Sequence, residues 1–174
     1  MGAAITGPQP APFDPVIADR LSWAAAARAG ALYTEQRTLT GTKEARMAHS
    51  TLQQWATARA DELPGAVPEQ PFGPDHWVYK VRGKMFLLLS DATGEPFVTV
   101  KARPADATTL REAFDEIIPG YHMNKRHWVS LRSGGSLEEP LVRDLVTESY
   151  LLVVESLPRV QRPVDPATFG QAPA

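Results

Sequence analysis

The segment Tyr121–Trp128 combines several side chains that could recognise a ligand. It holds two aromatic rings, two histidines, one asparagine and two cations within eight residues. Lys125 and Arg126 could contact the phosphates of DNA, and Asn124 or Arg126 could reach a base edge. Tyr121 or Trp128 could stack on an unpaired base. Aromatic rings of this size more often anchor a protein core, which favours a structural role for these two rings.

A second group of cations lies in a predicted β-hairpin earlier in the chain. Apolar and polar residues alternate over 77–82, Arg82-Gly83 forms a two-residue turn, and residues 84–90 make an apolar strand. Side chains two residues apart share a strand face, so Lys80 lies with Arg82, and Lys101 with Arg103. If the two faces coincide, a basic stripe crosses the hairpin; the alternative is an ordinary solvated face.

The overall charge of the protein hides this segregation. The formal net charge is −2, which argues against a protein that coats nucleic acid through bulk charge. Residues 76–103 nevertheless carry five basic and two acidic residues, and residues 121–132 carry three basic residues and no acid. The predicted helices over 104–118 and 136–157 are acidic instead. A local basic surface is therefore expected on the strands and their turns.

These patterns support three functional hypotheses. The first is DNA binding that weakens with salt, through the candidate residues Lys80, Arg82, Lys84, Lys101, Arg103, Asn124, Lys125 and Arg126. The second is a small-molecule or accessory protein with an aromatic pocket, whose candidate walls are Trp77, Tyr79, Phe97, Tyr121, His122 and Trp128. The third is a protein-interaction module in which the basic strands meet an acidic partner.

The sequence contains no recognisable catalytic or metal site. The absence of cysteine excludes disulfides, thiolate zinc sites, iron–sulfur clusters and cysteine nucleophiles. His122 and His127 are five residues apart, which fits neither a helical nor a strand pair of metal ligands, and no acid lies nearby. There is no phosphate-binding loop, nucleophile elbow or His–Glu zinc motif. We therefore expect no enzyme activity, no cofactor and no metal.

The 174 residues suffice for one α+β domain with extensions. We expect a flexible or partly helical extension over 1–46, with Met47 as an alternative natural start, a domain over 47–160, and a flexible Pro- and Ala-rich tail over 161–174. No apolar run approaches the ~18 residues of a membrane span. The N-terminus resembles no targeting signal, so a cytoplasmic monomer without membrane contact is expected.

Within that domain the periodicity predicts an antiparallel meander packed with helices. A helix follows a cap at Ser50 or begins near residue 43, and strands are expected over 76–82, 84–90, 97–103 and 127–132. A helix over 104–118 should bury an apolar face formed by Leu110, Phe114 and Ile117. The last helix should begin with a capping box made by Ser136 and Glu139 and end before Pro158.

Three stretches together resemble the MmcQ/YjbR family of small bacterial proteins, over roughly 51–160. They are 71–75 running into 78–86, then Val100-Lys101 with 110–112, and most specifically 119–128. The resemblance implies a fold like that of CyaY, the bacterial frataxin, and like the double-wing domain whose β-hairpin wings contact DNA. It therefore implies DNA binding.

The chain departs from the family pattern at two positions. Arg82 stands where the family usually has glycine or another small residue, and Glu155 stands where it often has lysine. The first change adds positive charge to a wing, and the second removes it from a helix. The likeness to frataxin also suggests iron binding on an acidic helix face formed by Asp106, Glu112, Asp115 and Glu116. An ordinary solvated helix face is the better explanation of these four acidic residues.

Overall fold

A computed structural model describes residues 50–73, 75–91 and 93–170. By its contacts the chain divides into two units, Met1–Lys43 and Glu44–Ala174, and all the described residues belong to the second. The expected extension over 1–46 and the alternative start at Met47 lie outside the described residues.

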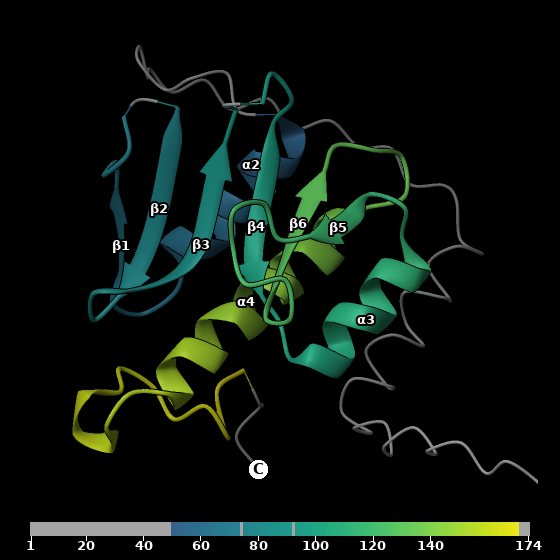
Figure 1. Cartoon of the computed structure of the whole chain (residues 1–174). Coiled ribbons are helices and arrows are strands. Elements are labelled where there is room, and N and C mark those ends of the chain that lie inside the picture. Colours follow the sequence, from purple (N-terminus) through teal and green to yellow (C-terminus); the bar gives the residue numbers. More distant parts are fainter. Residues whose placement is uncertain (1–49, 74, 92, 171–174) are drawn as a thin grey trace, which may run out of the picture. The chain divides into compact units, whose positions relative to one another are not determined.

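The described residues form one antiparallel sheet of six strands, in the order β1-β2-β3-β4-β6-β5, with helices packed against it (Figure 1). The strands are β1 (Ala66–Glu69), β2 (His76–Val81), β3 (Lys84–Ser90), β4 (Phe97–Lys101), β5 (Ile117–Pro119) and β6 (Trp128–Arg132). The helices are α2 (Thr51–Asp61), α3 (Pro104–Ala113), α4 (Glu139–Glu155) and the short 3-10 helix η1 (Arg159–Gln161). The predicted α+β class and the antiparallel meander are confirmed.

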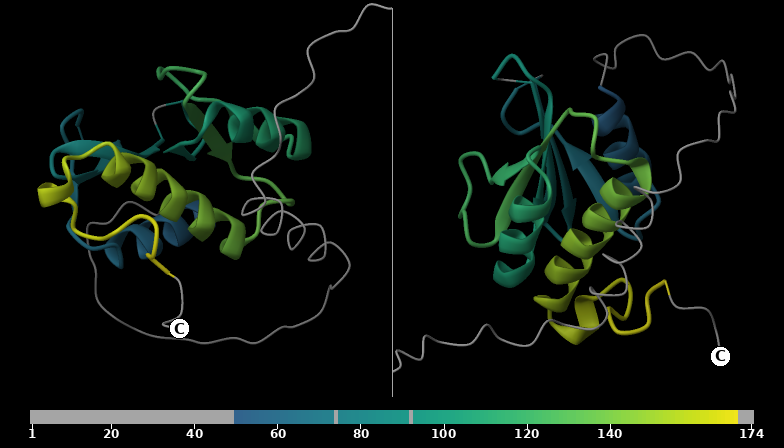
Figure 2. Two further views of the ribbon diagram at one scale, coloured as in Figure 1. Left: turned by 90° about the horizontal axis from the view of Figure 1, so that it is seen from below. Right: turned by 90° about the vertical axis from the view of Figure 1, so that its right-hand side faces the viewer.

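The sheet has a helix-covered face and a second face that carries the loop over 120–127. On one side, α2 and α4 pack against each other, α4 packs against β3 and β4, and α2 packs against β4; α3 and this loop lie on the other side (Figure 2). Tyr79 faces the helices, because its hydroxyl donates to Asp61 of α2 at 2.9 Å. Strand alternation then places Val78, Lys80, Thr99 and Lys101 on the loop side or its margin.

Phe86 occupies a β-bulge and is the centre of the packing between sheet and helices. Tyr79 pairs with Leu87 while Lys80 pairs with Met85, which leaves Phe86 as the extra residue of β3. Its ring is fully buried and meets Tyr150 of α4 edge-on, with 5.4 Å between centroids. The bulge therefore aims one more large side chain at the helix layer than strict alternation would allow.

For α2 the structure has one of the two starts expected from the sequence, and for α4 the expected start is wrong. Ser50 caps α2 in a capping box with Gln53. The box expected from Ser136 and Glu139 does not form, because α4 begins at Glu139 with Glu138 as a cap that makes no side-chain hydrogen bond. The Ser136 hydroxyl instead donates to the Glu116 carboxylate, and this hydrogen bond lowers the pKa of Glu116.

Two short strands and the end of α3 differ from the sequence-based expectation. Helix α3 stops at Ala113, and Ile117, expected on its buried stripe, lies in strand β5 opposite Leu131. Strand β1 was not expected, and its Pro68 is tolerated because β1 is an edge strand. Both added strands are three or four residues long and exist through pairing with a longer neighbour.

The segment after α4 makes contacts with the domain as far as Phe169, within the part of the expected tail that the structure describes. Arg162 donates to the carbonyls of Glu155 and Leu157, at 2.7 and 3.0 Å, and so caps the carboxyl end of α4. The ring of Phe169 lies 6.1 Å from that of Tyr150. These contacts connect the segment to the end of α4 and to the aromatic core.

Burial of Tyr150 makes the stability of the domain sensitive to alkaline pH. The buried hydroxyl donates to the carbonyl of Pro64, and desolvation raises the pKa of Tyr150 from 10.0 to about 12. The neutral phenol is favoured in the folded state, so its contribution is complete below pH 10.0 and is lost as pH rises toward about 12. We expect the free energy of unfolding, measured in urea, to fall over this range, and to fall less in Tyr150→Phe. An equal fall in both proteins would contradict this assignment.

Candidate nucleic-acid interface

The antiparallel topology brings the predicted cations to one end of the strands, along the border of the sheet where β2 and β4 end and β3 and β6 begin. The turn after β2, the end of β4, and the loop before β6 meet there, because neighbouring strands run in opposite directions. We call this region the basic edge and define it by Lys80, Arg82, Lys84, Lys101, Arg103, Lys125 and Arg126. Residues that are up to 46 positions apart in the sequence thus share one surface region.

Two of these cations lie on strands of the sheet, near the ends of β2 and β4. Lys80 is in register with Val67 of β1 and Met85 of β3, and Lys101 is in register with Trp128 of β6. The Lys101 ammonium lies 5.7 Å from the centre of the Trp128 ring, a cation–π contact. Lys80 pairs with Glu69 at 2.5 Å. The Lys80 and Lys101 side chains are half-buried, and both are available at the surface.

Three further cations surround the carboxyl end of α4. The Lys84 ammonium lies 3.3 Å from the carbonyl of Ser156, and Arg103 pairs with Glu155 at 3.3 Å. Arg82 donates from Nε to the carbonyl of Gln161 at 3.1 Å. The last turn of α4 contains no basic residue of its own, so cations from the strands complement the negative end of the helix dipole. These residues therefore stabilise the fold as well as adding positive charge.

The loop over 120–127 presents the two least engaged cations. Lys125 and Arg126 are exposed, and neither side chain has a hydrogen bond or ion pair among the described residues. Asn124 shapes the loop, because its side-chain oxygen accepts from the Arg126 amide at 3.0 Å and its carbonyl accepts from the His127 amide at 3.0 Å. Asn124 is thus placed as a turn residue beside the two cations.

The loop is hydrogen-bonded to neighbouring strand segments at both ends. The Tyr121 amide donates to the hydroxyl of Ser130 at 3.0 Å, and the Ala102 amide donates to the carbonyl of His127 at 2.9 Å. At Gly120 a Cβ atom would lie 2.6 Å from the Cβ of Trp128, so a larger residue would push the loop away. The cations of the loop therefore start from a fixed backbone.

Backbone strain occurs twice at this edge. Among the described residues, Arg82 and His122 are the non-glycine residues with positive φ, at 50° and 54°. Arg82 with Gly83 at 77° has the two positive φ angles that a tight hairpin turn demands, which explains why small residues suit this position. The left-handed conformation costs roughly 1–2 kcal/mol for an ordinary residue. Arg82 adopts this conformation at the tip of the turn, where its side chain is exposed.

The aromatic candidates do not gather around one cavity. Tyr79 is buried toward α2, and Trp77 shares its face by strand alternation. Tyr121, His122 and Trp128 lie on the other side, where the Tyr121 ring packs on Phe97 at 5.3 Å and on His122 at 4.1 Å. Tyr121 remains 40% exposed, but its ring lies against Phe97 at the start of β4, whereas Lys101 of the basic edge is at the end of that strand.

The described residues contain no cluster of side chains that could bind a metal ion. No group of three or more His, Cys, Asp or Glu side chains in this part of the chain is arranged to hold an ion. His122 and His127 lie in the same loop without a carboxylate partner among the described residues. In the same residues no helix is both long and apolar enough to span a bilayer.

Sequence reasoning missed two arginines that extend the basic edge. Arg159 and Arg162 follow the end of α4, and Gln161 between them accepts the hydrogen bond from Arg82. The expected boundaries leave Arg159 at the end of the domain over 47–160 and Arg162 in the tail, and neither is among the candidate residues. The available signal was their position, since basic residues directly after a helix complement its negative end.

Comparison with known proteins identifies the family. The YjbR family model matches residues 61–152. The uncharacterized protein YbdF of Escherichia coli O157:H7 is 40% identical over 111 residues, which cover 64% of this chain and 91% of YbdF. The uncharacterized protein YjbR of Escherichia coli K12 is 32% identical over 83 residues, which cover 48% of this chain and 70% of YjbR.

A solved structure agrees with the fold. The crystal structure of Deinococcus radiodurans protein DR2400, with a DUF419 domain, superposes with a TM-score of 0.59 and 28% identity. The match covers 67% of this chain and 91% of DR2400. Sequence motifs, family model and architecture thus agree, and the chain belongs to the YjbR family.

Proposed function

We propose that this protein binds nucleic acid, with the basic edge contacting the phosphate backbone. The observation that carries the proposal is the convergence of seven cations from three separate connections on one edge of the sheet. A net charge of −2 makes that concentration a local feature rather than a consequence of composition. Phosphate contacts of this kind supply affinity without reading sequence.

The free donors at the edge suit an extended polyanion. Lys125 and Arg126 have no described partner, and Arg82 uses only its Nε in the contact with Gln161. The ion pairs of Lys80 and Arg103 are partly exposed, and such pairs typically contribute 1 kcal/mol or less, so phosphate can replace their carboxylates. The hairpin tip and the loop would then contact the backbone as two neighbouring wings.

Two aromatic rings lie on the loop side of the sheet, where unpaired bases would stack. Trp128 lies under the Lys101 ammonium at the basic edge, and Tyr121, which is 40% exposed, lies farther along the strands against Phe97. A base can stack on such a ring while the adjacent cation holds the phosphate. Comparison of a duplex with a single strand of the same length measures whether these rings contribute.

Fluorescence anisotropy with a labelled duplex of random sequence tests the proposal. Four to seven phosphate contacts predict a slope of log affinity against log salt of about −4 to −6 between ~50 and ~200 mM salt. A duplex that fails to bind at the lower salt, or binds with a slope near zero, would overturn the proposal. In that case nuclease-resistant, salt-sensitive capture of an acidic protein would favour the interaction module, and ligand screening would address a small molecule.

A further inference from the structure

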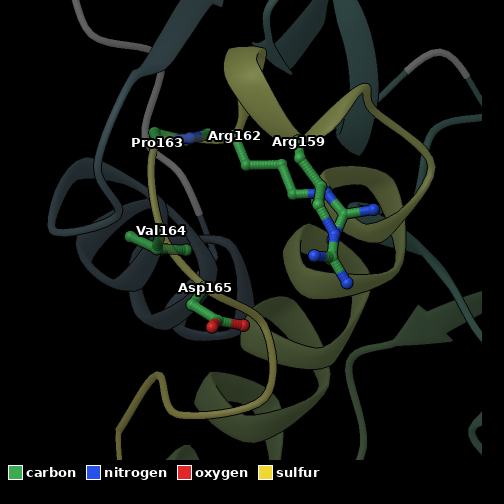
Figure 3. Close-up of a pocket in the computed structure, with 5 residues that line it drawn as sticks. All are labelled: Arg159, Arg162, Pro163, Val164 and Asp165. Atoms are coloured by element: carbon green, nitrogen blue, oxygen red, sulfur yellow. The ribbon is translucent and has the colours of Figure 1, made fainter.

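An open groove lies beside the carboxyl end of α4, formed by the segment that follows the helix (Figure 3). It encloses 390 Å³ and is lined by Arg159, Arg162, Pro163, Val164 and Asp165. This volume falls within the roughly 300–1,000 Å³ of small-molecule sites. All five residues lie beyond the part of the chain that the family model matches, residues 61–152. The groove therefore needs an explanation of its own.

Two guanidinium groups lie together at one end of the groove. Arg159 is the first residue of the 3-10 helix η1, and Arg162 is the extended residue that follows it. Arg162 is held in place by its bonds from Nε to Leu157 and from Nη2 to Glu155. Its Nη1 and the whole guanidinium of Arg159 have no hydrogen bond among the described residues. This end of the groove therefore offers an anion the donors of two guanidinium groups, of which that of Arg162 is held in place.

The opposite end of the groove carries a carboxylate. Asp165 lies away from the two guanidinium groups in Figure 3, with the side chains of Pro163 and Val164 on the wall. One carboxylate oxygen of Asp165 accepts from the amide of Ala167 at 3.0 Å, and the other has no hydrogen bond among the described residues. A simple anion would use only the arginine end, whereas a ligand that also carries hydroxyl groups would use both.

We propose that this groove binds a phosphate monoester of the nucleotide class. Its phosphate would accept from Arg159 and from Nη1 of Arg162, a sugar hydroxyl would donate to Asp165, and the apolar part would lie along Pro163 and Val164. A free mononucleotide and the phosphorylated end of a nucleic acid present this same chemistry. The hydrogen bond from Arg82 to Gln161 connects the groove to the basic edge, but the inference does not depend on backbone binding there.

Isothermal titration of the full chain with adenosine 5′-monophosphate, adenosine and inorganic phosphate tests the proposal. The monophosphate should bind more tightly than inorganic phosphate, and adenosine should not bind measurably. Arg159→Ala should weaken monophosphate binding about tenfold or more, since charge-assisted hydrogen bonds of this kind are lost. Arg132→Ala removes an exposed arginine from the far end of β6 and serves as the matched control. Absence of monophosphate binding, or equal binding by Arg159→Ala and wild type, would overturn the proposal.

Two further binding experiments are needed. One distinguishes nucleic-acid ends from free nucleotides as the ligand, and the other distinguishes the groove from the basic edge as the binding site. At a salt concentration that abolishes backbone binding, preference for a 5′-phosphorylated over an unphosphorylated oligonucleotide assigns the groove to nucleic-acid ends. Equal binding of the two, together with monophosphate binding, assigns it to free nucleotides. Lys125→Ala with Arg126→Ala should leave monophosphate binding unchanged, so a failure of the proposed backbone contacts remains distinguishable from a failure of the groove.

Discussion

Replacing Lys125 and Arg126 together by alanine is expected to lower the affinity for duplex DNA about 100-fold at low salt. Each lost charge-assisted phosphate contact removes roughly tenfold, and neither side chain has a described partner whose loss would disturb the fold. The loss should be the same for unrelated sequences, because phosphate contacts carry no base information. The salt slope should become shallower by about two units. Anisotropy titrations at several salt concentrations measure both quantities.

A control with the same change of charge makes this result interpretable. Arg111 lies on α3 and Arg132 at the far end of β6, both outside the basic edge. Their side chains donate to the carbonyls of Ala107 and Asp115, and Arg111 also contacts the Thr108 hydroxyl at 3.4 Å. Arg111→Ala with Arg132→Ala should therefore leave the slope unchanged and weaken binding only slightly. Equal losses in the two double variants would mean that net charge, and not the basic edge, determines binding.

Phe86→Ala is expected to lower the free energy of unfolding by about 3–5 kcal/mol, the usual range for a fully buried phenylalanine. The ring fills the space between the bulge of β3 and Tyr150, and the shortened side chain would leave a cavity that neither can close. Urea unfolding followed by circular dichroism measures the loss. The same change would loosen β3 next to the hairpin that carries Arg82 and Lys84.

Phe72→Ala provides the matched comparison for this effect. Phe72 is 69% exposed and has one edge contact with His76, so its loss should change stability by no more than about 0.5 kcal/mol. If both variants lost similar stability, the ring of Phe86 would not have the central packing role that its burial indicates.

Strong local patterns were sufficient for much of the fold. The hairpin of β2 and β3 followed from alternation and from a turn that requires positive φ, and the start of α2 followed from a side chain that satisfies nearby amides. The ends of weaker elements could not be predicted in this way. Ser136 has the type and spacing of a helix cap, but a carboxylate 20 residues away in sequence, that of Glu116, competes for its hydroxyl.

The candidate site likewise depends partly on local sequence patterns and partly on contacts between distant segments. By itself the sequence determined the family, the α+β class and which strands and loops carry the cations, because residue type and periodicity are local properties. Only the tertiary structure decided that these cations share one edge, that Arg82, Lys84 and Arg103 also surround the end of α4, and that Arg159 and Arg162 line a groove. Strand register and packing between distant segments decide such neighbourhoods, and no local pattern encodes them.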